Sequence, residues 1–443
     1  MGSRKMEEPK KLIDLNKLGH EMYDLMRRLY PICRSITGDG FRKTLNIIHE
    51  HVPLEVYEVA TGTKVFDWVV PKEWNIKDAY VKNSKGNRVI DFKESNLHVV
   101  SYSAPVHKKM SLSQLKNHLH SIPDHPDWIP YRTSYYKEDW GFCLNHNKLL
   151  ELAEDTYEVS IDSTLKEGHL TYGEHYIKGE NSDEVLLSCH ACHPSLCNDN
   201  LSGIVVLTFL TRYLLSLSLR YSYRVLFIPG TIGSIAWLAL NESKASMIKH
   251  GLVIAGVGDP GEPTYKRSRR GNAEVDRAAG HVLKHSGNDF KIVDFSPYGY
   301  DERQYCSPGL DLPVGCLQRT PYGQYPEYHT SADNCEFVQP LYLADSFSKL
   351  SEIINILESN KIYLNTSPKC EPQLGKRGLY ENVGDQSGVI EMRMAHLWVL
   401  NLSDGKHTLL DIAERSGLAF DLVKNSASIL SERGLLQESP SKV

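Results

Sequence analysis

The chain has 443 residues, of which 41% are hydrophobic and 24% are charged, and this ordinary globular composition excludes a disordered protein or a coiled-coil rod. Its net charge of −5 excludes a strongly basic surface of the kind that holds nucleic acid or an anionic membrane. The length suggests about two to four domains. Nineteen histidines are a high count and a first indication of metal or acid–base chemistry.

No segment is expected to cross a membrane or to direct secretion. The most apolar stretch, residues 201–219, contains serine, glycine, threonine and arginine, which predicts a buried helix. The first eleven residues are charged and lack the apolar core of a signal peptide. The nine cysteines are therefore predicted to be free thiols in a cytoplasmic protein.

The first half of the chain changes from helical to β-rich character. Residues 1–55 are predicted to be helical, because leucine and methionine recur at helical spacing between Leu15 and Leu29. Residues 56–170 contain short runs rich in valine and aromatic residues, broken by proline, glycine and asparagine, which predicts a mostly β domain. Its tryptophans, at positions 68, 74, 128 and 140, are expected to pack in the core, with a substrate cleft as the alternative.

Residues 171–365 alternate between short apolar runs and helical patterns. Strands are predicted near 184–189, 223–228 and 252–257, helices near 202–217, 234–241 and 276–285, and a long helix near 340–358. Such alternation is typical of an α/β domain, with a parallel or mixed sheet covered by helices on both faces.

The last segment, residues 371–443, is predicted to be a separate winged-helix domain, with helices at 408–416 and 420–433. Between Thr408 and Leu436 it has three cationic and four anionic side chains, too little positive charge for several phosphate contacts. We therefore expect no nucleic-acid binding. Docking onto the catalytic domain or onto a partner subunit of a homo-oligomer is expected instead.

Three polar clusters occur in separate loops of the α/β domain. The first, CHACHPSLCNDN from Cys189, follows a predicted strand; the others are YDERQYCSPG from Tyr300 and YPEYHTSADN from Tyr325. Ligands of open α/β sheets bind beyond the carboxyl ends of strands, and zinc prefers histidine nitrogen and carboxylate oxygen. The clusters therefore predict a metal site at one sheet edge, with a hydrogen-bond network between loops as the alternative. Cys189 and Cys192 are expected to be buried thiols rather than a zinc or redox pair.

Over nearly its whole length the chain resembles the bacterial aminopeptidase-like zinc hydrolases, distant relatives of the co-catalytic zinc exopeptidases. The matching segments are YPICRSITGDG from Tyr30, GTKVFDWVVPKEW from Gly62, YRTSYYKEDWGFCL from Tyr131, CHPSLCNDNLSG from Cys192, IPGTIGSIAWL from Ile228, YDERQYCSPGLDLPV from Tyr300 and YPEYHTSADN from Tyr325. The resemblance implies a zinc-exopeptidase-like mixed sheet covered by helices, to which residues 1–55 and 171–365 contribute. It also implies that the β-rich domain is an insertion and that a winged helix follows.

The resemblance implies His193, Asp199 and His329 as metal ligands, and His190 is a fourth candidate. Two carboxylate positions of true aminopeptidases are altered. Gly230 stands where related sequences carry glutamate, and Asp259 lies beyond the expected position of an aspartate ligand. A second cation would therefore have too few anionic ligands, which favours one zinc ion with an open position for water.

With glycine at position 230, another carboxylate must act as general base, and Glu302, Glu327 and Asp301 are the candidates. Arg303 is a candidate to bind a substrate carboxylate or an oxyanion.

The resemblance implies a zinc-dependent aminopeptidase-like amidohydrolase that acts on a small peptide or aminoacyl conjugate through metal-activated water. A second hypothesis is an inactive or repurposed scaffold that binds a peptide or sugar conjugate or serves as an assembly module. A third is a metal-dependent condensing or cyclising enzyme in a biosynthetic pathway.

Overall fold

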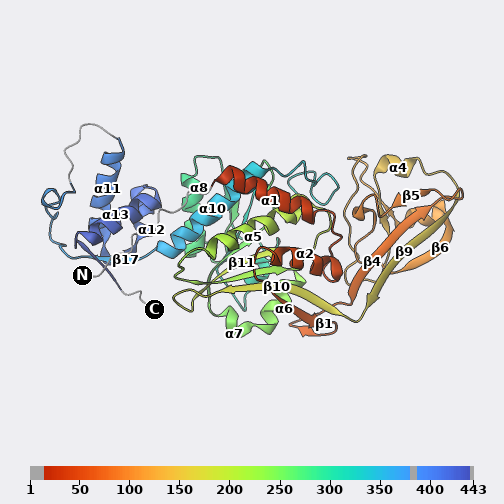
Figure 1. Cartoon of the computed structure of the whole chain (residues 1–443), viewed down its shortest axis with the longest axis horizontal. Coiled ribbons are helices and arrows are strands. Elements are labelled where there is room, and N and C mark those ends of the chain that lie inside the picture. Colours follow the sequence, from red (N-terminus) through yellow and green to blue (C-terminus); the bar gives the residue numbers. More distant parts are fainter. Residues whose placement is uncertain (1–13, 380–386, 440–443) are drawn as a thin grey trace. The chain divides into compact units, whose positions relative to one another are not determined.

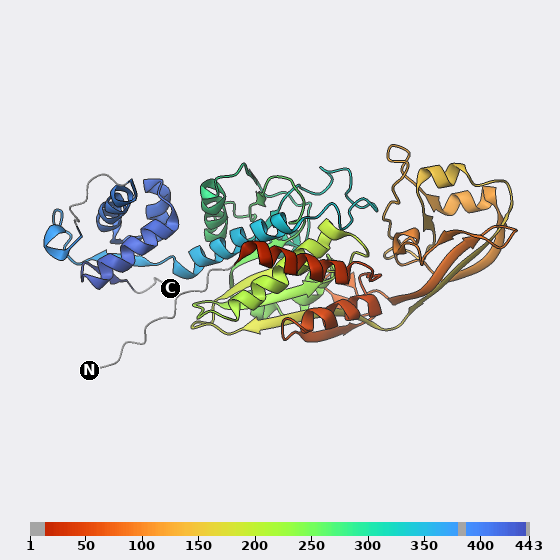
Figure 2. The same ribbon diagram turned by 45° about the horizontal axis from the view of Figure 1, so that its top comes forward.

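The computed structural model describes residues 14–379 and 387–439 (Figures 1 and 2). They form two compact units. Unit 1 comprises the described residues up to Gly271 together with Lys291–Ser348, and unit 2 comprises Asn272–Phe290 and the described residues from Lys349 onward. The part of the predicted N-terminal helical region before residue 14 lies outside the described residues.

An eight-stranded mixed sheet is the centre of unit 1, with the strand order β1-β10-β12-β11-β13-β16-β14-β15. β11 pairs in parallel with β12 and β13, whereas β10 pairs antiparallel with β1 and β12. The strands are β1 (Glu55–Ala60), β10 (His169–Ile177), β11 (Glu184–His190), β12 (Ser222–Ile228), β13 (Ile248–Ile254), β14 (Thr264–Lys266), β15 (Lys291–Val293) and β16 (Val314–Gln318). β11 and β12 are buried at every residue, which explains their near-continuous apolar sequence. The predicted mixed α/β architecture is confirmed.

Helices cover this sheet (Figure 1). α5 (Gly203–Leu214) lies between β11 and α1 (Leu15–Leu29) and is buried along most of its length, as predicted. α1 is amphipathic, and the Asp14 side chain caps it by accepting the Lys17 backbone N–H at 3.0 Å. The other helices of unit 1 are α2 (Asp39–His49), α6 (Ile232–Leu240), α7 (Glu242–Ala245) and α9 (Glu302–Tyr305), and α10 (Pro340–Ser359) begins in unit 1 and continues into unit 2.

The β-rich part of unit 1 is a four-stranded antiparallel sheet in the order β5-β4-β9-β6, with its own apolar core. Its elements are β4 (Glu73–Lys82), β5 (Arg88–Asp91), β6 (Val106–Ser111) and β9 (Thr156–Lys166), accompanied by the short strands β2 (Lys64–Val65), β3 (Trp68–Val69), β7 (Leu119–His120) and β8 (Phe142–Cys143) and the short helices α3 (Leu112–Leu115) and α4 (His146–Leu150).

Two expectations for this region need correction. The expected boundary at residue 56 falls inside β1, which belongs to the central sheet; its pairing with β10 is long-range, so local sequence patterns do not encode it. Core packing was the expectation for the tryptophans. It is confirmed for Trp74, which is 2% exposed, and wrong for Trp68, which is 45% exposed.

Unit 2 has a three-stranded antiparallel sheet in the order β18-β17-β19, combined with helices. Its elements are α8 (Glu274–His285), β17 (Ile362–Asn365), α11 (Ser387–Leu402), β18 (Asp404–Thr408), α12 (Leu409–Ser416), α13 (Phe420–Glu432) and β19 (Leu436–Glu438). The expected boundary at residue 371 is too late, because β17 is the central strand of this sheet. α8, expected in the α/β domain, belongs to unit 2, where Arg277 forms ion pairs with Asp411 and Glu414.

In the described parts of the chain, no helix is both long and apolar enough to cross a bilayer. All nine cysteines are free thiols, and Cys189 and Cys192 are buried, as predicted.

His281 in α8 gives unit 2 a predicted pH dependence. Its Nε2 accepts the Phe420 backbone N–H at 3.0 Å, and burial, helped by nearby His285 and Lys284, lowers its pKa to about 4. The unfolded imidazole has a pKa of about 6.5, so the stabilising contribution is complete above that pH and is lost as the pH falls towards 4. We expect the melting temperature of unit 2, followed by calorimetry of the full chain, to fall between about pH 7 and pH 5. His281→Gln should flatten that fall relative to the wild type, and an equally steep fall in His281→Gln and the wild type would contradict the assignment.

Candidate metal centre

The loop that follows β11 carries the densest group of polar side chains in unit 1. His190 is the last residue of β11, and a short π-helical stretch, Cys197–Ser202, leads from the loop into α5. Asp199, in this stretch, is fully buried. A carboxylate can be this far from water only if charges or hydrogen bonds compensate it.

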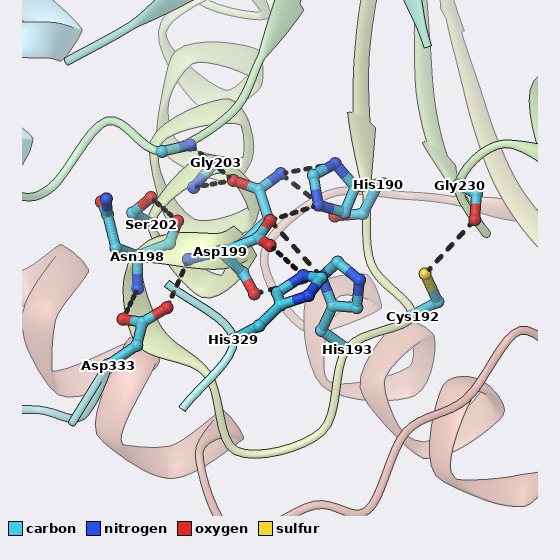
Figure 3. Close-up of polar contacts among 12 residues, drawn as sticks. His190, Cys192, His193, Asn198, Asp199, Ser202, Gly203, Gly230, His329 and Asp333 are labelled. Atoms are coloured by element: carbon cyan, nitrogen blue, oxygen red, sulfur yellow. Dashed lines mark hydrogen bonds and ion pairs between the residues drawn. The ribbon is translucent and has the colours of Figure 1, made fainter. Parts of the chain in front are cut away.

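Three histidines supply that compensation (Figure 3). His190 Nε2 lies 2.7 Å from Asp199 Oδ1, and His193 Nδ1 lies 3.4 Å from the same oxygen. His329 Nε2 lies 3.0 Å from the other oxygen, Oδ2. The structure thus brings all four predicted ligand residues together from separate stretches of chain. The ligand atoms of His190, His193 and Asp199 all lie within 4.8 Å of one another.

The charge state of the cluster follows from these contacts. Burial by itself would raise the pKa of Asp199, but His193, His190 and His329 hold it well below its usual range. Burial lowers the pKa of His329. Carboxylate oxygen and imidazole nitrogen are donors that zinc prefers, so these residues fit a zinc ion.

A second layer of residues fixes the Asp199 loop. Asp333 accepts the backbone N–H groups of Asn198, at 2.5 Å, and Asp199, at 2.9 Å. Burial raises the pKa of Asp333 to about 8. Arg34, fully buried, donates from Nε to the His193 carbonyl at 2.7 Å. Neither Arg34 nor Asp333 was predicted to have a role in the site, although each lies in a sequence motif shared with the resembling family.

Asp259, which lies beyond the expected ligand position, is hydrogen-bonded to the loop that carries Asp199. Its Oδ2 accepts a hydrogen bond from Asn198 Nδ2 at 3.0 Å, and its Oδ1 accepts from the Gly261 backbone and the Thr320 hydroxyl. These bonds occupy the Asp259 carboxylate and fix the position of Asn198, which directly precedes Asp199.

Tyrosines surround the three imidazoles. Tyr300 stacks on His190 with ring centroids 5.0 Å apart, and Tyr328 stacks on His329 at 3.9 Å. The ring of Tyr131 meets the edges of His193 and His329 at 5.3 and 5.1 Å. Since aromatic rings restrict imidazole orientation and exclude water, they help to preform the cluster.

Gly230 lies beside His190 and Asp301. A Cβ at position 230 would stand 2.9 Å from the His190 Cβ, so a side chain there requires His190 to move. That Cβ would also lie 3.5 Å from Asp301 Oδ2. The structure thus places the Asp301 carboxylate next to the point from which the glutamate of related sequences would extend.

Asp301 is fully buried, and burial raises its pKa to about 6. Its Oδ1 lies 2.7 Å from the Ser234 hydroxyl, whereas its Oδ2 is buried with no hydrogen-bond partner in the described structure. The Ser234 hydroxyl is also 2.7 Å from the Thr231 carbonyl. A carboxyl group that is neither fully ionised nor fully hydrogen-bonded can accept or release a proton near neutral pH.

The other sequence candidates differ from Asp301. Glu302 is buried and accepts a hydrogen bond from Lys266 Nζ at 2.8 Å, and Lys266 also donates to the Ser296 and Tyr298 carbonyls in the segment before Glu302. Arg303 lies over the exposed Tyr298 ring, 5.8 Å from the centroid, and its buried Nε has no partner in the described structure. For Glu327, the described contacts include none between its carboxylate and the three-histidine cluster.

Comparison with known proteins identifies the two parts of the chain. Residues 23–360 match the family model described as a domain of unknown function, DUF4910, and residues 361–438 match a winged helix-turn-helix model. A Clostridium acetobutylicum protein is 56% identical over 433 residues, covering 98% of this chain and 100% of its own length. Its provisional name is a polysaccharide biosynthesis protein with an aminopeptidase-like domain.

Solved structures agree with this assignment. The crystal structure of a protein from the same organism, provisionally called a peptidase, has a TM-score of 0.92 and 55% identity and covers 96% of this chain and 98% of its own. A zinc aminopeptidase from Bacillus subtilis shares the fold at a TM-score of 0.57 and 13% identity, covering 79% of this chain and 96% of its own. The predicted resemblance to aminopeptidase-like proteins is thereby confirmed, and the fold is one that a zinc aminopeptidase shares. The chain belongs to the DUF4910 family of aminopeptidase-like proteins and carries a winged helix at the end of that domain.

Proposed function

We propose that this protein is a zinc-dependent amidohydrolase of aminopeptidase type, acting on an aminoacyl conjugate. The observation that carries the proposal is the convergence of three imidazoles on the buried Asp199 carboxylate, at nitrogen–oxygen distances of 2.7, 3.4 and 3.0 Å. A cluster of this kind, lined by tyrosines at the carboxyl end of a parallel strand, is where open α/β sheets bind ligands.

The proposed ligands are His193, Asp199 and His329, with His190 as the fourth candidate. Zinc bound there would act as a Lewis acid that polarises the scissile carbonyl. His190 and His193 share one oxygen of Asp199 while His329 faces the other. The Asp259 carboxylate is hydrogen-bonded to Asn198, and Gly230 has no side chain, so neither position adds a carboxylate ligand. We therefore propose one ion rather than two.

Asp301 is the proposed general base. It lies in the space next to Gly230, its pKa of about 6 allows proton exchange near neutrality, and its Oδ2 has no competing partner among the described residues. Glu302 is held by Lys266, which favours a structural role for it. Arg303, beside the exposed Tyr298, is proposed to bind a negatively charged group of the substrate.

The proposed substrate is an amide in which an aminoacyl group is joined to a sugar or a small peptide. The name of the Clostridium acetobutylicum relative connects that protein with polysaccharide biosynthesis. An amino sugar that carries an aminoacyl group contains both the amide that an aminopeptidase-like site would cleave and the sugar that a glycan pathway would use.

One observation favours a second candidate, an inactive scaffold that binds such a conjugate without cleaving it. The His190 side chain occupies the space that a residue larger than glycine would need at position 230. The site therefore has no room for the glutamate that related sequences carry there. The two candidates differ in one measurement, which is turnover of aminoacyl p-nitroanilides and N-aminoacyl hexosamines. Turnover that is lost with a chelator and restored by zinc supports the hydrolase, and its absence on every substrate supports the scaffold.

Asp199→Asn tests the metal site. The substitution removes the one carboxylate among the proposed ligands, so zinc affinity should fall by more than the roughly 10–100-fold typical of outer-shell changes. Zinc content by elemental analysis and affinity by chelator competition measure the effect. Asp39→Asn, whose side chain is 82% exposed, is the matched control and should retain full zinc content. Equal zinc content in both variants would contradict the site.

Asp301→Asn tests the general base. The amide nearly preserves shape but cannot accept the proton, so kcat should fall by about 10²–10⁴-fold while zinc content remains unchanged. Glu302→Gln is the comparison: it loses the Lys266 ion pair, so a lower melting temperature with a smaller loss in kcat is expected. If Glu302→Gln abolishes turnover and Asp301→Asn does not, the assignment of the base is reversed.

A further inference from the structure

Four large apolar side chains gather on one exposed part of unit 1. Phe66, Trp68, Val69 and Tyr136 are 45%, 45%, 52% and 53% exposed. The first three lie on the β2–β3 hairpin and Tyr136 lies in a distant loop, yet the Trp68 and Tyr136 rings meet with centroids 5.3 Å apart. We call these four residues the aromatic rim. Exposed apolar clusters of this kind commonly mark a binding surface.

A hollow of about 400 Å³ adjoins two residues of the aromatic rim, Val69 and Tyr136. Val69 and Tyr136 contribute to its wall, and so do the polar side chains of Lys72, Ser134 and Glu138. The wall therefore combines an aromatic face with hydroxyl, ammonium and carboxylate groups. The volume is within the usual range for small-molecule sites.

The backbone at the aromatic rim is in a conformation that aromatic residues rarely adopt. Phe66 has a φ of 55° and Tyr136 a φ of 64°, both in the left-handed region where glycine or asparagine is favoured. Neither side chain is buried, so core packing does not compensate for this strain. Phe66 begins the two-residue loop between β2 and β3, where a positive φ is the usual turn geometry, so Tyr136 is the position at which the strain indicates a functional constraint.

The aromatic rim is connected to the candidate metal centre by a short stretch of chain. Tyr131, which contacts the rings of His193 and His329, donates its backbone N–H to the His329 carbonyl at 2.7 Å. The hydroxyls of Tyr131 and Tyr135 lie 2.9 Å apart, and Tyr136 is the next residue. Five residues span at most about 18 Å, so a substrate of a few sugar or amino-acid units can reach both places.

We propose that the aromatic rim and its hollow form a subsite for a pyranose ring of a glycan-linked substrate. A pyranose has an apolar C–H face and a rim of hydroxyls. The face matches the Tyr136 ring in the wall of the hollow, which the neighbouring Trp68 ring contacts, and the hydroxyls match Lys72, Ser134 and Glu138. An apolar peptide side chain would make no hydrogen bonds with Lys72, Ser134 and Glu138, whereas the hydroxyls of a pyranose can. The subsite rests on the proposed function in one respect: the ring belongs to the molecule whose amide reaches the metal centre.

The test is binding of the full-length protein to an immobilised array of bacterial hexose, hexosamine and uronic acid oligosaccharides, followed by titration of the strongest ligand. We expect Trp68→Ala to weaken binding at least tenfold. Leu150→Ala, a substitution at a side chain that is 71% exposed on the same unit, should leave binding unchanged. Tyr136→Ala gives an independent second measurement if Trp68→Ala lowers the melting temperature.

The outcomes separate the subsite from the hydrolase. Glycan binding that depends on Trp68 and persists in Asp199→Asn supports the subsite even if no amide is cleaved. Three results overturn it: no glycan on the array is bound, Trp68→Ala binds as tightly as the wild type, or Trp68→Ala changes only peptide binding or the oligomeric state in light scattering. In each of these cases hydrolysis of aminoacyl p-nitroanilides can still be measured, so the proposed function stands or falls separately.

Discussion

The candidate site depends on one constraint, which is that the Asp199 carboxylate is removed from water. A buried anion requires compensating partners, and His190, His193 and His329 provide them from the end of β11, its following loop and a distant loop. The residues behind the histidines also help to hold Asp199 in its buried position. Asp333 and Arg34 bind backbone groups rather than the carboxylate itself, so they fix the loop and leave the Asp199 oxygens to the imidazoles.

The region around Gly230 shows how a site can change while its fold is retained. Aminopeptidase-like sequences place a glutamate after the second strand of the α/β core, and here that space is bounded by the His190 ring and the Asp301 carboxylate. An acidic group is therefore present in the same region but comes from another loop. Its two oxygens have unequal surroundings, one beside Ser234 and one without a partner in the described structure. Glu302 also has one oxygen without a partner in the described structure, and it differs from Asp301 in that an ammonium group, Lys266, holds its other oxygen.

Sequence patterns predicted the elements that depend on local physics. β11 and β12 are apolar because both faces are covered, and α5 and α1 follow helical spacing, so each is recognisable without the fold. The histidine and aspartate clusters were recognisable for the same reason, because metal-binding residue types that follow a predicted strand can be identified from the sequence alone. Boundaries were less predictable, because the short strands β1 and β17 gain their identity from partners far away in the chain.

The sequence by itself thus determined the α/β class, the winged helix and the polar clusters at the strand ends, because each of these leaves a local pattern of apolar or polar residues, while the resemblance to a known family selected the candidate ligands within those clusters. Only the tertiary structure decided that Asp301 lies beside Gly230, that Glu302 is paired with Lys266 and that Trp68 is exposed against Tyr136. The reason is physical: whether a carboxylate is paired, or an aromatic ring is covered, depends on which distant segment comes to lie next to it.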